Sequence, residues 1–111
     1  MTDAARTLDL PVETLDERDA ERYQTRIRLI ATSTLRGEFA VVLLNISATG
    51  GLIQAPFKLR PGSEIAIIVD GSMIYVGSVT WYGYGFAGLR FANRIPDEVV
   101  SFLVALSGSQ G

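Results

Sequence analysis

The stretch EIAIIVDGSMIYVGSVTW, residues 64–81, decides the fold class. Two runs rich in β-branched residues flank Asp70-Gly71, a dipeptide that is strongly preferred in tight β-hairpin turns. Short runs of this composition, bounded by turn residues, are typical of strands. The stretch therefore predicts an antiparallel hairpin.

The same pattern recurs on both sides of this hairpin. Apolar runs that end at turn signals predict six strands, over residues 26–32, 39–46, 52–54, 64–69, 74–81 and about 85–91. Pro96 then opens a helix in which Val99, Phe102, Leu103 and Leu106 share one face. Together these elements predict an all-β fold, a six-stranded antiparallel barrel with a C-terminal α-helix.

Composition limits the chemistry that this chain can perform. The 111 residues suit one domain, and both cysteine and histidine are absent. Their absence excludes disulfides, thiol nucleophiles and sites that depend on a histidine base or ligand. Because no paired-carboxylate constellation stands out either, we predict no catalytic residues, no metal and no cofactor.

Charge divides the chain into an acidic start and a mildly basic body. Residues 1–21 hold seven acidic and two basic side chains, whereas the remainder holds five acidic and eight basic ones. We expect a flexible acidic arm over 1–21, a barrel domain with its helix over 22–107 and a disordered tail over 108–111. No apolar run reaches the ~18 residues of a membrane span, and the polar start is unlike a signal peptide. The sequence thus predicts a cytoplasmic protein without membrane insertion.

Two short motifs carry the candidate site. Arg22 and Arg26 form an arginine pair four residues apart, which chance would produce about 0.7 times in a chain of this composition. Asn45, Ser47 and Gly50 fit the pattern Asp/Asn-x-Ser-x-x-Gly, which chance would produce only about 0.05 times. The second motif is therefore the more specific signal.

These residue types fit the recognition of a nucleotide. Arg22 and Arg26 share one side of a strand or a helix, and an arginine fork binds phosphate or the O6/N7 edge of guanine with two hydrogen bonds. Strand alternation predicts that Asn45 and Ser47 lie on the same face as the apolar residues before them. An asparagine amide can pair with a base edge, and Gly50 tolerates a positive φ and a close ligand.

Together these features resemble the PilZ domain family, bacterial receptors for cyclic di-GMP. The resemblance runs from about residue 22 to 106 and includes both motifs, the six strands and the closing helix. The Val-x-Trp at 79–81 and the run GLRF at 88–91 are also similar to the later strands of that family. The chain departs from the family at Tyr23, where many members carry another arginine, and at Glu21, which would repel a phosphate if it pointed inward.

The resemblance implies a role for each motif. Arg22 and Arg26 would clasp guanine edges and phosphates from a flexible arm, and Asn45, Ser47 and Gly50 would hold a guanine against the barrel. The ligand would pull the arm onto the barrel and change the surface that an unidentified protein partner contacts. Weaker ligand candidates are Tyr23, Gly51 and Trp81, whereas Arg28, Arg60, Arg90 and Arg94 are expected on solvated faces.

Two other interpretations belong to different functional classes. One is a PilZ-like interaction module that binds no ligand. The other is an OB-like barrel that binds single-stranded nucleic acid through its aromatic side chains, which a pI near 5.0 disfavours. We therefore predict a cyclic di-GMP receptor, a monomer or weak dimer that is not an enzyme and binds no nucleic-acid polymer.

Overall fold

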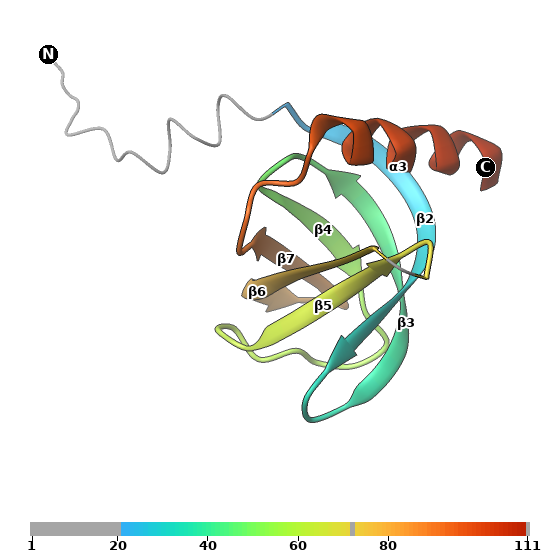
Figure 1. Cartoon of the computed structure of the whole chain (residues 1–111). Coiled ribbons are helices and arrows are strands. Elements are labelled where there is room, and N and C mark those ends of the chain that lie inside the picture. Colours follow the sequence, from blue (N-terminus) through green and yellow to red (C-terminus); the bar gives the residue numbers. More distant parts are fainter. Residues whose placement is uncertain (1–20, 72, 111) are drawn as a thin grey trace, which may run out of the picture.

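The computed structural model describes residues 21–71 and 73–110, whose strands close into a barrel with a helix across one end (Figure 1). Around this barrel the strands follow the order β2-β3-β4-β7-β6-β5, and every neighbouring pair is antiparallel. This confirms the predicted fold class. The elements are β2 (Tyr23–Ser33), β3 (Gly37–Ile46), β4 (Gly50–Gln54), β5 (Glu64–Val69), β6 (Met73–Gly83), β7 (Phe86–Phe91) and α3 (Asp97–Gln110).

Turn chemistry explains the hairpins. Asp70 and Gly71 have φ of 54° and 73°, so the predicted β5–β6 turn uses a dipeptide that tolerates the left-handed region. Tyr84 and Gly85 form a two-residue turn with φ of 54° and 87°, as a type I′ hairpin requires. β7 consequently begins at Phe86, one residue later than predicted.

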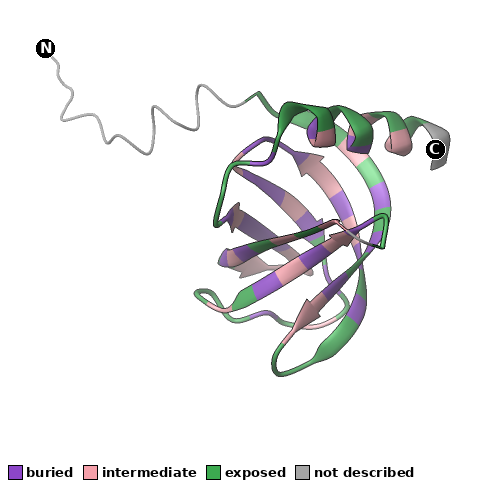
Figure 2. Cartoon of the chain, viewed as in Figure 1, coloured by how far each residue is buried: buried purple, intermediate pink, exposed green. Residues whose placement is uncertain are grey.

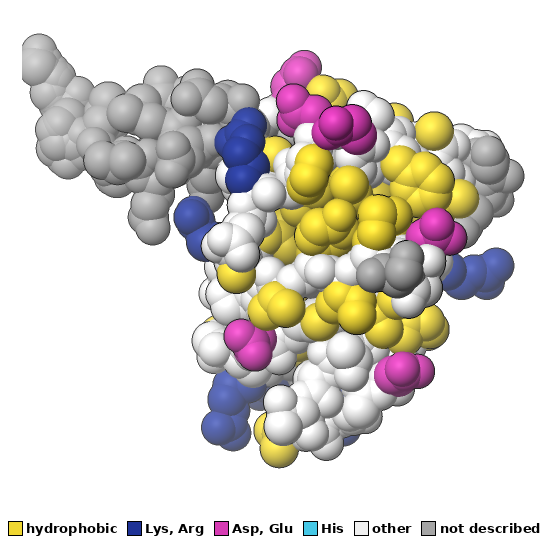
Figure 3. Space-filling view, viewed as in Figure 1, with side chains coloured by type: hydrophobic (Ala, Val, Ile, Leu, Met, Phe, Trp, Pro, Cys, Tyr) yellow, Lys and Arg dark blue, Asp and Glu magenta, His cyan; other side chains and the backbone are white. Residues whose placement is uncertain are grey.

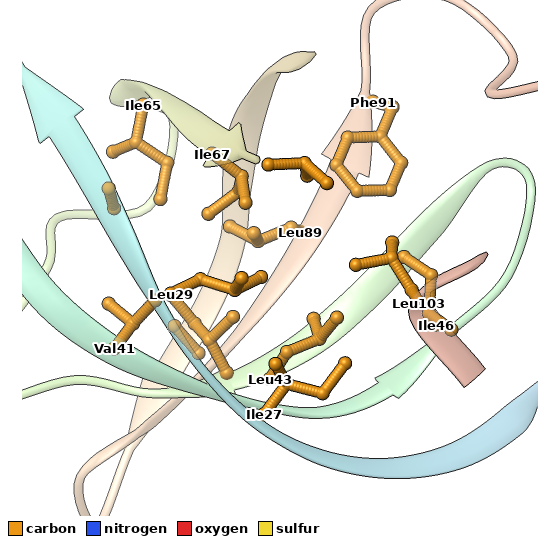
Figure 4. Packing of buried hydrophobic residues seen from close by; sticks show 14 of the residues in the cluster. Ile27, Leu29, Val41, Leu43, Ile46, Ile65, Ile67, Leu89, Phe91 and Leu103 are labelled. Carbon is orange, nitrogen blue, oxygen red and sulfur yellow. The ribbon is translucent and has the colours of Figure 1, made fainter. Parts of the chain in front are cut away.

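The core fills the inside of the barrel. Along β2 buried residues alternate with exposed ones, which Figure 2 shows as bands on the ribbon. Leucine, isoleucine and valine side chains from all six strands meet inside, and full burial of each contributes roughly 1.5–3 kcal/mol (Figure 4). Val100 and Leu103 of α3 complete this core, whereas Phe102, which was predicted to share the docking face, stays exposed.

Three of the strands contain register shifts, which are β-bulges. They fall between Gln24 and Ile27 in β2, between Leu43 and Asn45 in β3, and between Val79 and Trp81 in β6. Each bulge adds one residue, so side chains beyond it exchange faces.

The bulge in β3 overturns one prediction. Ile46 is 1% exposed and takes the inner position, which leaves Asn45 on the outer surface. Asn45 therefore does not share the face of Val41 and Leu43. Strand alternation gives the wrong face here because it assumes that every second residue points inward. The bulge inserts one extra residue, so the pattern shifts by one position after it.

The ends of the predicted domain also differ. β2 begins at Tyr23, so residues 23–26 belong to a strand and not to a loose arm. α3 includes residues 108–110, which were expected to be a disordered tail. Except for Glu21, the predicted acidic arm lies outside the described residues, as does Gly111.

Part of one face of the molecule carries a cluster of apolar side chains. Figure 3 shows hydrophobic side chains gathered over α3 and the β5–β6 hairpin, and these elements include the exposed Ile74, Val76 and Phe102. In the part of the chain that the structure describes, no helix has the length and hydrophobicity to span a membrane.

Candidate functional site

A groove of about 600 Å³, here called the first groove, opens on the outer surface of the barrel. Its walls come from the residue before β2, the end of β3, the turn into β4, and the middle of β6 and β7. Predicted site residues line it together: Arg22, Asn45, Gly50, Gly51 and Trp81. The two sequence motifs thus meet at one place.

Cross-strand register explains why residues far apart in sequence share this groove. Asn45 of β3 pairs with Leu52 of β4, which pairs with Gly88 of β7. Gly88 in turn pairs with Trp81 of β6. Because neighbouring strands are about 4.8 Å apart, this row extends roughly 14 Å from Asn45 to Trp81.

A hydrogen bond joins the two motifs. Arg22 Nη1 donates to Asn45 Oδ1 at 3.2 Å. Since the amide oxygen of Asn45 accepts this bond, its Nδ2 group can donate to a ligand. Arg22 carries further N–H donors on the same planar fork, so both residues present donors at one edge of the groove.

Ser47 shapes the turn between β3 and β4. Its side chain is 1% exposed, and its hydroxyl oxygen accepts from the N–H groups of Thr49 at 3.2 Å and Gly50 at 3.1 Å. Its own N–H donates to the Gly50 carbonyl at 2.8 Å. Ser47 does not line the first groove, so its hydroxyl positions Thr49 and Gly50, which do.

Two glycines let the strands lie close beneath the groove. A Cβ on Gly50 would collide with the backbone oxygen of Leu89 on β7. A Cβ on Gly88 would collide with Nε1 of the Trp81 indole. The sequence motif suggested that Gly50 takes a positive φ. Its φ lies outside the left-handed region, so close packing against β7 is the reason for glycine at this position.

Trp81 faces outward because of the bulge in β6. Val79, two residues earlier, is buried, whereas Trp81 is 48% exposed and its indole lies over Gly88. A half-exposed indole on a sheet surface offers a flat face on which a base can stack. Trp81, a weaker candidate from the sequence, therefore lies in the groove.

Two other predicted residues lie away from the first groove. The backbone N–H of Arg26 donates to Ser107 Oγ of α3 at 2.8 Å, and Arg26 does not line the groove. The Tyr23 hydroxyl donates to Glu21 Oε1 at 2.9 Å. This hydrogen bond and the negative charge of Glu21 raise the pKa of the Tyr23 hydroxyl above its usual value. The hydrogen bond also holds the Glu21 carboxylate beside Tyr23.

The charge of the first groove is positive. Arg22 and Arg90 line it, and none of its described lining residues is Asp or Glu. No local sequence pattern selects Arg90, because it reaches this groove through the pairing of β7 with β4, where Arg90 is opposite Gly50. Among the described residues, no three His, Cys, Asp or Glu side chains are grouped as a metal site would require.

Comparisons with known proteins agree with this architecture. No protein-family model and no curated protein match the sequence. Among solved structures, a crystal structure described as the PilZ domain of CeSA from a cellulose-synthesizing bacterium is similar, with a TM-score of 0.54. The two chains are 18% identical over 81% of this chain and 97% of that one. The barrel and its closing helix therefore have a PilZ-like fold, as the sequence motifs predicted.

Proposed function

We propose that this chain is a receptor for cyclic di-GMP and not an enzyme. The hydrogen bond from Arg22 to Asn45 is the observation that carries the proposal, because it joins the two motifs at the edge of one groove. The groove is positive, contains an exposed indole and presents amide and guanidinium donors. These are the groups that bind phosphates and base edges.

Each part of the ligand has a counterpart in the groove. Arginine forks would bind the phosphates, and the Asn45 amide would pair with a guanine edge. A guanine stacked on Trp81 would add about 1–3 kcal/mol. Gly50 and Gly51 line the groove, so the ligand would lie near the backbone of β4.

The proposed signal is a change of surface charge. Residues 23–26 already belong to β2, so ordering of this segment is not needed for a response. A bound ligand with two phosphates would instead cover two arginines and replace a positive groove with a neutral or negative surface. An unidentified protein partner that contacts this side of the barrel would then bind differently.

Calorimetric titration and thermal unfolding test the proposal. At a cyclic di-GMP concentration about one hundred times Kd, we expect a gain of roughly 2.7 kcal/mol. For a domain of this size, the gain corresponds to a Tm rise on the order of 10 °C. Trp81 is the sole tryptophan, so its fluorescence should change in the same titration.

Two matched ligands serve as controls. GMP carries one base and should bind more weakly, and a single-stranded DNA oligonucleotide should not bind. A folded protein whose Tm does not move at saturating cyclic di-GMP would contradict the receptor proposal. A Tm rise with the oligonucleotide alone would favour an OB-like function instead.

A further inference from the structure

We infer that Arg90 binds the ligand phosphates from the β7 side of the first groove, opposite the wall that carries Arg22. This inference rests on the proposed function. Both arginines line the groove, although 68 positions separate them in the sequence. The juxtaposition arises from the barrel, because β7 lies next to β4.

The alternation of β7 places Arg90 on the groove side. Ala87, Leu89 and Phe91 are buried in the core, so Gly88 and Arg90 belong to the outer face. Gly88 is part of the row that joins Asn45 to Trp81, and Arg90 is the next outward residue of β7. Arg90 therefore lies one step, about 7 Å, along the strand from that row.

The neighbour of Arg90 on β4 is a glycine of the groove lining. Arg90 pairs with Gly50, and the absence of a Cβ there lets the backbone of β7 lie close against β4. On the far side of Gly50, the turn held by Ser47 leads back to β3 and Asn45. A phosphate above Gly50 would thus lie between the two walls that carry arginine.

Charge supports a two-sided arrangement. Arg22 and Arg90 are the two basic residues of the described lining. Arg26 was predicted to be the second arginine, but it does not line the groove, and its backbone N–H donates to Ser107 Oγ of α3. In this conformation Arg90 supplies the second positive charge that a ligand with two phosphates needs.

Single substitutions with a matched arginine test the inference. Calorimetric titration with cyclic di-GMP would compare Arg90→Ala, Arg22→Ala and Arg60→Ala in the full chain. Arg60 is an exposed arginine of a different groove, so its loss changes net charge equally without touching the first groove. We expect Arg90→Ala and Arg22→Ala to raise Kd by about 10- to 150-fold, and Arg60→Ala by less than about twofold.

A second variant and a second readout separate binding from folding. Arg90→Lys keeps the stem and the charge but not the planar fork, so it should retain the unliganded Tm and recover only part of the affinity. Added NaCl should weaken the wild type more steeply than Arg90→Ala, because one screened contact is missing.

The outcomes distinguish the two proposals. If Arg22→Ala loses affinity while Arg90→Ala binds like the wild type, Arg90 is not a ligand residue and the receptor proposal stands. Equal losses for Arg90→Ala and Arg60→Ala would likewise overturn the inference, since net charge would explain both. If the wild type does not bind cyclic di-GMP, both proposals fail.

Discussion

Two grooves of similar size lie at opposite ends of the β2–β3 hairpin. The first groove holds the motif residues, and a second groove of about 690 Å³ lies beside the turn at residues 34–36 and the loop before β5. The second groove is lined by more basic residues, Arg36, Lys58 and Arg60, than the first. Neither volume nor positive charge therefore distinguishes a nucleotide site in this molecule.

The two grooves differ in the types of residue that line them and in the contacts those residues make. The first has glycines in β4 and β7, an exposed indole and an asparagine held by an arginine. In the second, Arg36 lies over the Phe57 ring at 4.2 Å, Glu64 lines the wall, and Leu35 is 93% exposed. A planar anionic ligand fits the first set, whereas the second contains a carboxylate that opposes anions.

Glycine substitutions should give the largest difference between the two grooves. Gly50→Ala would force a methyl group against the Leu89 backbone, and we expect a loss of about 3 kcal/mol in unfolding free energy together with loss of ligand binding. Gly62→Ala, beside the second groove, has open space but φ of 91°, and should cost only about 1 kcal/mol. Urea unfolding measures both, and equal stabilities would contradict the close-approach argument.

Removal of one exposed apolar side chain from each groove tests whether the effect on ligand affinity is specific to the first groove. Trp81→Ala should weaken cyclic di-GMP binding by about 1–3 kcal/mol, because a stacking surface is lost. Leu35→Ala should leave affinity unchanged, although Leu35 is more exposed than Trp81. Calorimetry measures both, and equal effects would show that Trp81 does not stack on the ligand.

Two serines that organise turns form the next pair. Ser47→Ala would leave the buried N–H of Gly50 and the partly buried N–H of Thr49 without their acceptor, and we expect a stability loss of about 1–3 kcal/mol. Ser33 accepts from the Arg36 N–H at 3.0 Å in a more exposed turn, so Ser33→Ala should cost less than about 1 kcal/mol. Unchanged stability with lost binding in Ser47→Ala would instead indicate direct contact with the ligand.

Tyr23→Phe should have the smallest effect. It releases the Glu21 carboxylate, which can then approach the groove and repel phosphate, so we expect affinity to fall about two- to threefold at low salt. Glu21→Gln in the same variant should restore affinity, and Tyr84→Phe, at a fully exposed tyrosine, is the control. A Tyr23→Phe variant with unchanged affinity would mean that Glu21 does not influence the groove.

The same contact predicts a pH dependence. The pKa of Tyr23 is raised in the folded chain, so the contribution of this hydrogen bond to stability is present below pH ~10. It is lost as the pH rises through the raised pKa, because a phenolate cannot donate to Glu21. Ultraviolet titration of wild type against Tyr23→Phe should show the loss of one late-titrating phenol.

The sequence was sufficient for the barrel because turn residues and alternation act locally. Asp70-Gly71 identified a hairpin, and the two motifs identified Arg22 and Asn45, which the structure brings together. The outward positions of Asn45 and Trp81 could not be predicted, because each follows a bulge that strand alternation does not reveal. Arg90 required the register between β4 and β7, which connects residues forty positions apart.

The closure of the barrel has a consequence for how other proteins can bind it. Each of the six described strands has a hydrogen-bonded strand neighbour on both sides, so no strand offers a free edge along its whole length for another protein to extend. A partner that docks on the closed barrel wall would therefore recognise side chains, and a nucleotide held in the first groove would become part of the surface that this partner contacts.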